Sequence, residues 1–263
     1  MKTISHYLKV YRLFVSTSFS MATSFRLNFF LLILMDLFFY FSTLATVSII
    51  YDHVQTIGPW SKEQLMFFTS FMLCVDHLHM TLLSESFWVF SRDLKIGNID
   101  FVLLKPISSI FTIFFRYVRP SSLCNIFVIW ACVIYYGRQI DLTILAWIAL
   151  PLLVILSFIL LAILEIIIST SMFWMTEGMG INFLRMQMQN LSRWPDFIYS
   201  KLSRRVLKFA IPILIIGSAP VHFLLDQNMW HYLIYLLVAI AASFIIMVKL
   251  WSFALRQYES ASS

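Results

Sequence analysis

Charged residues are scarce in this chain. They make up 12% of its 263 residues, whereas hydrophobic residues make up 60%. Soluble globular domains carry about 25% charged residues. A chain this apolar cannot hide its side chains in one water-excluded core, so its solvent must be lipid. The composition therefore predicts an integral membrane protein.

Glycine and cysteine are also rare. Their scarcity excludes several kinds of active site that are built from these residues. Only six glycines occur, and none belongs to a GxxxxGK[ST] phosphate cradle. Cys74, Cys124 and Cys132 lie in apolar runs without CxxC spacing, so neither a disulfide framework nor a thiolate metal site is indicated. No HExxH pair or nucleophile elbow is present. We expect no enzymatic activity, no metal site and no bound cofactor in this chain.

What the sequence does contain is long apolar runs. Crossing a hydrocarbon layer of about 30 Å takes roughly 20 helical residues. The runs are continuous and rich in Leu, Ile and Phe, unlike the alternating strands of a membrane barrel. No long polar linker separates them, which predicts one all-α polytopic domain over residues 1–263. The six predicted transmembrane helices lie near 27–50, 64–90, 107–136, 142–174, 205–225 and 229–252.

The distribution of Lys and Arg predicts the orientation. Of the 19 cations, only Lys62 and Arg138 fall in the connections that follow spans one, three and five. The others fall before span one, after span six, or between spans two and three and spans four and five. Such residues are retained in the cytoplasm, so both termini should be cytoplasmic. These cations are spread over loop ends that face lipid head groups and are not gathered on one soluble face. They therefore indicate no nucleic-acid partner.

Residues 1–25 have the pattern of an amphipathic helix. Lysines, arginines and serines fall broadly on one face, which favours a helix lying in the membrane interface. A frayed basic tail is the alternative. The apolar face would consist of Ile4, Leu8, Tyr11, Val15 and Phe19.

Six ionisable residues within the predicted spans are candidates for function or pairing, because charge inside a membrane is costly. They are Asp36 in span one, Asp76, His77, His79 and Glu85 in span two, and Glu165 in span four. Of these, Asp36, Asp76, His79 and Glu165 are the four candidate residues for a pathway. Asp76 and His79 share a helix face, but Asp76-His77-Leu78-His79 is a poor chelating arrangement. Pairing across helices and lining of a wet cavity both remain open for these residues.

The connector between spans two and three mixes charge with apolar residues, and we name residues 92–106 the coupling segment. Gly97 permits a sharp bend, and Pro106 can begin the next helix. A short amphipathic helix of this kind docks into a partner's groove by its apolar anchors. A solvated connector on the membrane is the equal alternative. The predicted apolar ridge is Ile99, Val102, Leu103 and Leu104.

A family resemblance favours the docking interpretation. The run from Phe90 to Ile107 resembles the hallmark loop of type-2 ATP-binding-cassette (ABC) exporter permeases, and within them a bacterial branch of ABC transport systems. Two further stretches agree, namely Phe209-Ala-Ile-Pro212 leading to Ser218-Ala219-Pro220, and the ending Leu255–Ser263. The resemblance covers essentially the whole chain.

The resemblance implies a specific set of elements. These are an N-terminal interfacial elbow helix, a cytoplasmic coupling helix, a second cytoplasmic contact between spans four and five, and a partly re-entrant segment between spans five and six. Gly217, Pro220 and Asn228 are the residues expected to break that segment. The residues expected to contact the ATPase are Arg92, Asp93, Gly97, Asp100, Leu103, Leu104, Lys105 and Pro106.

The resemblance also implies partners. They are two ABC-type ATPase subunits, which hold the ATP and Mg, and a second permease subunit that is identical or related. The predicted function is the permease subunit of an ATP-driven exporter in the bacterial cytoplasmic membrane. The alternative is a proton-coupled secondary transporter, in which Asp36, Asp76, His79 and Glu165 form a relay.

Overall fold

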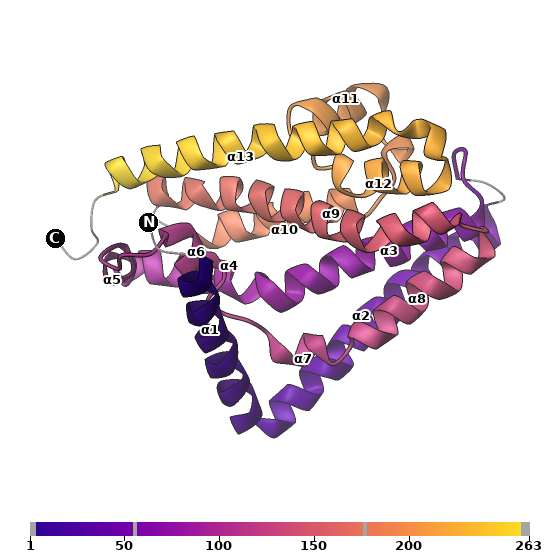
Figure 1. Ribbon diagram of the computed structural model, residues 1–263. Helices are drawn as coiled ribbons and strands as arrows, with labels where there is room; N and C mark the ends of the chain where they lie inside the picture. The colour runs from indigo at the N-terminus through magenta and orange to yellow at the C-terminus, as the bar shows by residue number, and fades with distance from the viewer. Residues whose placement is uncertain (1–3, 55–56, 176–177, 259–263) are drawn as a thin grey trace.

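The computed structural model describes residues 4–54, 57–175 and 178–258, and every regular element within these ranges is a helix. Lys2 and the ending 259–263 lie outside the described residues. Figure 1 shows long helices lying side by side. We call the end that carries α5 (Ile99–Leu103) and the end of α13 (His231–Gln257) the terminal end, and the opposite end the hairpin end.

Four helices are long and apolar enough to cross a membrane, and they coincide with four predicted spans. They are α2 (Arg26–His53), α3 (Lys62–Leu82), α9 (Ile144–Thr170), which continues into η1 (Ser171–Trp174), and α13. The central helix is α3, which packs against α2, α8 (Ile126–Gln139), α9 and α12 (Ile215–Leu225). Most of α2 and α13 stays exposed within the single chain, so these helices offer their outer faces to lipid or to another subunit.

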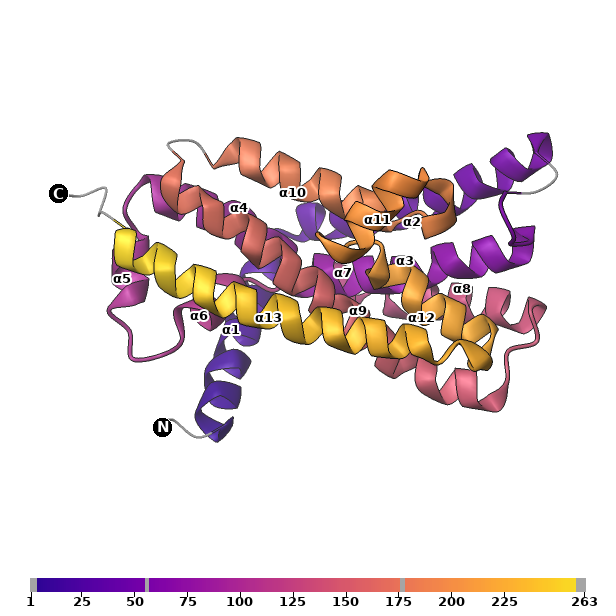
Figure 2. The same ribbon diagram turned by 90° about the horizontal axis from the view of Figure 1, so that it is seen from above.

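Helix α1 (Ile4–Ser24) lies across the bundle in both ribbon views (Figures 1 and 2) and has no buried residue. The Tyr7 hydroxyl accepts a hydrogen bond from the Ser108 N–H at 3.3 Å, and Ser18 Oγ accepts one from the Val118 N–H at 3.3 Å. An amphipathic helix in this crosswise position is suited to the membrane interface, as the elbow prediction requires.

The prediction of a continuous helix over 107–136 is wrong. This stretch forms α6 (Ser109–Phe114), α7 (Pro120–Leu123) and α8. Pro120 disfavours a helical conformation at the residue before it, and Arg119 is extended with φ −102° and ψ 93°. Neighbouring helices satisfy the irregular backbone, since the N–H of Arg119 donates to the Thr81 carbonyl at 2.8 Å.

The predicted span over 205–225 is also divided. Pro212 separates α11 (Lys201–Phe209) from α12. Figure 2 shows α10 (Met179–Ser192) running beside α9, with η2 (Asp196–Ile198), α11 and α12 following toward the hairpin end. The predicted fifth span is therefore broken into α11 and α12, and α10 lies in the bundle before it.

This arrangement differs from two expectations about residues 178–208, which the predicted spans place in a cytoplasmic connection between spans four and five. The stretch is not a surface connector at the terminal end, because the α10 side chains of Asn182, Arg185 and Gln189 are buried in the bundle. Nor do its six cations all lie at the terminal end, where the cations of the coupling segment lie. Two of them are on or just after α10, and the four on α11 lie nearer the hairpin end (Figure 1).

The predicted break at Gly217 and Pro220 is wrong as well, because α12 is continuous through both residues. Proline in a helix frees the carbonyl four residues earlier. Here the hydroxyl of Ser157 on α9 donates to that carbonyl, Ile216 O, at 2.7 Å. Asn228 belongs to the short turn η3 (Gln227–Met229) before α13. A tight turn therefore stands where a re-entrant break was expected.

Gly217 allows α12 to approach α3 closely. A Cβ built there would lie 2.5 Å from Met72 Sδ and 3.0 Å from the Phe68 ring. We expect Gly217→Val to destabilise the protein by about 1–3 kcal/mol, the usual cost of overpacking a core. Thermal unfolding in detergent measures this effect. Gly180→Val is the matched control, since among the described residues nothing beyond its own neighbouring helix backbone lies within 4 Å of the position its Cβ would take. Equal melting temperatures for the two variants would contradict the role of Gly217.

Candidate functional site

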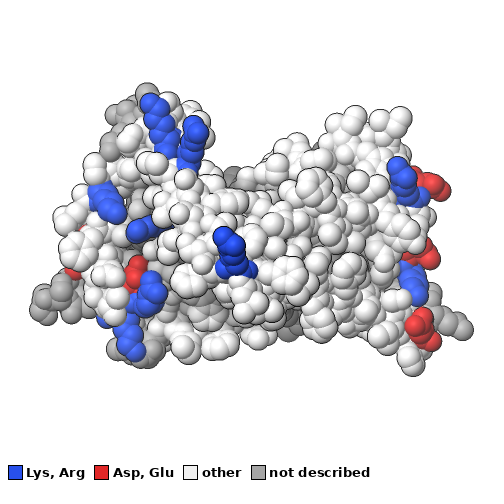
Figure 3. Space-filling view, turned by 90° about the horizontal axis from the view of Figure 1, so that it is seen from below, with Lys and Arg blue, Asp and Glu red and all other residues white. Residues whose placement is uncertain are grey.

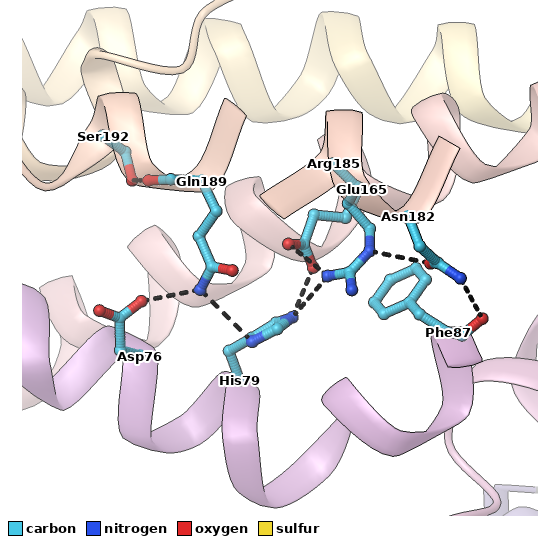
Figure 4. A network of polar contacts seen from close by, with 8 residues as sticks. All are labelled: Asp76, His79, Phe87, Glu165, Asn182, Arg185, Gln189 and Ser192. Carbon is cyan, nitrogen blue, oxygen red and sulfur yellow. Dashed lines mark hydrogen bonds and ion pairs between the residues drawn. The ribbon is translucent and has the colours of Figure 1, made fainter. Parts of the chain in front are cut away.

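Buried polar residues gather where α3, α9 and α10 meet. Figure 4 shows Asp76 and His79 on α3 facing Glu165 on α9, with the α10 side chains closing the group from the other side. Each of these three residues is at most 3% exposed. We name the group the three-helix network. Burial at this depth requires every charge to have a partner.

Glu165 is the centre of the three-helix network. Its Oε1 accepts a hydrogen bond from Arg185 Nη1 at 2.9 Å, and its Oε2 lies 2.6 Å from His79 Nε2. Arg185 is only 1% exposed, and its guanidinium lies 4.3 Å from the centre of the Phe87 ring. The carboxylate therefore has two basic partners from two different helices, and the arginine has an aromatic face as well.

Asp76 forms the second half of the three-helix network. Its Oδ1 accepts from Gln189 Nε2 at 2.8 Å, and its Oδ2 accepts from Arg193 Nε at 2.8 Å. Gln189 Nε2 also lies 3.4 Å from His79 Nδ1, which links this half to Glu165. The pairs join α3 to α10 over about two helical turns, from Arg185 to Arg193.

Sequence reasoning missed the α10 residues of this network. Asn182, Arg185 and Gln189 are spaced by three and four positions, the spacing of one helix face. That polar stripe was present in the sequence. It was overlooked because the whole stretch was assigned to the membrane surface, where polar residues need no partner.

Asp36 lies in a separate cluster near the break in the third crossing. Arg119 Nη2 donates to its Oδ1 at 2.9 Å, and Ser122 Oγ donates to its Oδ2 at 2.7 Å. Asn125 Nδ2 adds a bond to the Ile33 carbonyl at 3.2 Å. The Asp36 cluster therefore fixes α7 against α2. All four candidate residues, Asp36, Asp76, His79 and Glu165, are held in ion pairs, which favours the pairing interpretation.

The coupling segment lies at the terminal end (Figure 1). Gly97 has a φ of +76°, a conformation that favours glycine, and turns the chain between α4 (Ser84–Lys95) and α5. Ile99 and Val102 are buried against the protein itself, and Leu103 packs on the core. The predicted apolar ridge is therefore divided, and of its four members only Leu104 faces outward.

The outward apolar surface of the coupling segment consists of Ile96, Phe101 and Leu104, which are 59%, 70% and 81% exposed. Charged residues belong to the same segment. Arg92 and Asp93 form an ion pair of 3.4 Å, Asp100 is half-buried, and Lys105 is exposed, as is the apolar Pro106. Sequence reasoning missed Ile96 and Phe101, because the sequence of a five-residue helix does not show which of its sides faces outward.

The distribution of surface charge agrees with a membrane protein. Figure 3 shows Lys and Arg over the terminal part of one face and mixed charges at the hairpin end, with a broad band between them that is almost uncharged. A band of this kind suits the hydrocarbon layer.

The comparison with known families decides the identity. A family model described as "ABC-2 family transporter protein" matches residues 31–262. The chain belongs to this family. No curated protein and no solved structure matches it significantly. As an ABC-2 transporter protein, the chain is the membrane-embedded permease component of an ABC transporter. Permeases of this family associate with ABC ATPase subunits and are not themselves the ATPase.

Charge pairing in this ABC-2 transporter protein can be tested at Glu165. Glu165→Gln leaves the Arg185 guanidinium buried without its carboxylate, and removing one partner of a buried pair costs about 3–5 kcal/mol. We expect a large fall in thermal stability, and adding Arg185→Met should restore much of it. Glu63→Gln, at an exposed position on α3, is the control. If the double variant is less stable than Glu165→Gln, the pair is not the source of the loss.

Proposed function

We propose that this chain is the permease subunit of an ATP-driven exporter, and that an ATPase subunit acts on it through the coupling segment. The observation that carries the proposal is the exposed surface of Ile96, Phe101 and Leu104 at the terminal end. Three large exposed apolar side chains within nine residues of the chain, in a segment that also carries charged residues, have the composition of a docking site for another protein.

The position of α5 also suits this role. Its inner side, with Ile99 1% exposed and Val102 also buried, packs on α4 and α6. The chain passes from α3 into α4 with only Leu83 between them, and Leu83 N–H still bonds to the His79 carbonyl at 3.0 Å. A push on α5 would therefore move α3, which carries Asp76 and His79 of the three-helix network.

The assembly that this proposal implies contains two ATPase subunits, which hold the ATP and Mg. It also contains a second permease subunit that is identical or related. In this assembly the terminal end faces the cytoplasm of a bacterial cell, and both termini are cytoplasmic. The cations of the coupling segment and of the last turns of α13 support this orientation. The exposed faces of α2 and α13 are surfaces on which the second permease subunit can pack.

The coupling role predicts a specific defect. The double variant Phe101→Asp/Leu104→Asp places two charges on the docking surface, so the ATPase should no longer co-purify from the native cell in mild detergent. Membrane insertion should be unchanged, because both side chains are exposed. Mass spectrometry of the purified complex measures the ATPase content, which we expect to fall at least about tenfold, or about 1.4 kcal/mol.

The matched control is Val54→Asp, an exposed apolar residue at the hairpin end of α2. It should leave the complex intact. A normal ATPase content in Phe101→Asp/Leu104→Asp would rule out the coupling role. Transport that runs on a proton gradient in vesicles lacking the ATPase would favour the relay of Asp36, Asp76, His79 and Glu165 instead.

A further inference from the structure

Helix α11 is sharply amphipathic. Lys201, Arg205 and Lys208 recur at intervals of four and three residues and so form one row along the helix. Leu202 and Phe209 lie on the adjacent side and are 74% and 73% exposed. A short helix with a basic row beside an exposed apolar row is suited to lie among lipid head groups.

Contacts place α11 in the hairpin half of the molecule. Phe197, just before it, stacks edge-on against Trp60 in the α2–α3 connection, with 4.9 Å between ring centres. At the other end of α11, Lys208 Nζ lies 5.5 Å from the centre of the Tyr232 ring in the first turns of α13. Both ribbon views show α11 next to α12, in the half of the molecule toward the hairpin end (Figures 1 and 2).

An apolar groove of about 440 Å³ has Lys208 among its lining residues, and the 5.5 Å between Lys208 Nζ and the Tyr232 ring places this lysine at the end nearer the start of α13. The groove lies between α9, α10 and α13 and is closed on one side by the chain from α11 to α12. Lys208 is the single charged residue among those that line it, and nearly all of the others are apolar. Representative lining residues are Ile167, Met188, Phe209, Ile215, Tyr235 and Ala242.

The length of the groove matches one leaflet. On α13 it extends from Tyr235 to Ile246, which is about 16 Å at 1.5 Å per residue. One leaflet occupies half of a hydrocarbon layer of about 30 Å, or about 15 Å. A hydrocarbon chain whose polar end lies at Lys208 would therefore reach the middle of the bilayer.

The charge at the mouth of the groove specifies the polar end. Lys208 Nζ lies 2.6 Å from Asp196 Oδ2, so part of its charge is balanced. Lys201 and Arg205 are exposed, and no ion pair found in the part of the chain that the structure describes includes them. The mouth therefore keeps an excess of positive charge, which favours a phosphate without a balancing cation.

We propose that this groove binds one acyl chain of an anionic phospholipid from the leaflet at the hairpin end, with the phosphate held by Lys201, Arg205 and Lys208. A second copy of this chain fits the groove itself less well, although it can still pack on other parts of α2 and α13. Two copies that met symmetrically over this groove would bring two basic rows together, and like charges repel.

The test is native mass spectrometry of the purified full chain in detergent, titrated with dioleoyl-phosphatidylglycerol or dioleoyl-phosphatidylcholine. We expect the first lipid to bind more tightly when it is phosphatidylglycerol. Lys201→Gln/Arg205→Gln should weaken that binding about 30-fold, equivalent to about 2 kcal/mol, and leave phosphatidylcholine unaffected. The charge-matched control is Lys249→Gln/Arg256→Gln at the far end of α13, which should bind as the unaltered chain does.

A second pair of variants tests the groove itself. Ala242→Trp fills it and should abolish the first binding event for phosphatidylglycerol, whereas Ala241→Trp should not, because Ala241 is also exposed but does not line the groove. Both alanines are exposed on α13, so folding should survive either change.

Three results would overturn the proposal. The first is equal affinity of the unaltered chain for the two lipids. The second is unchanged phosphatidylglycerol binding in Ala242→Trp. The third is a dimer that Ala242→Trp dissociates while lipid binding persists, which would assign the groove to a second copy. The assay needs no ATPase, so its outcome is independent of the proposed function.

Discussion

Pairing of charge inside the bundle is the constraint on which the rest of this structure depends. Glu165 pairs with Arg185 and His79, and Asp76 accepts hydrogen bonds from Gln189 and Arg193. Without those acceptors, α10 would bring a guanidinium into an apolar interior with no compensation. The three-helix network is therefore what allows a fourteen-residue helix with polar side chains to pack inside the bundle.

The same constraint governs the irregular backbone. Where the third crossing breaks, Arg119 is bound both through its side chain to Asp36 and through its N–H to Thr81. Where Pro220 removes a helix hydrogen bond, Ser157 satisfies the carbonyl that is left. Backbone groups within a membrane must be satisfied by protein or water, and in both places a neighbouring helix does this.

The sequence predicted those parts of the fold that depend on local pattern. Uniform apolar runs revealed α2, α3, α9 and α13, and amphipathic spacing revealed α1. The remainder depends on partners far away in the chain. The sequence alone gives no sign that Arg119 pairs with Asp36, so it was counted among the loop cations. In the same way, Arg185 was assigned to the surface because its partner Glu165 is distant in the chain. Hydropathy alone also makes a crossing that is broken at Pro212 look like one span over 205–225.

The irregular stretch between α6 and α7 has a consequence for the order of assembly. Its hydrogen bonds reach Ser86, Asp36 and Ser18, which are 31, 83 and 100 residues from their partners. None of these bonds can form until α1, α2 and α4 are in position, because each closes a long loop. The shape of this stretch therefore depends on the helices that precede it. It takes its final shape only when α1 lies in the interface and α2 is already inserted beside it.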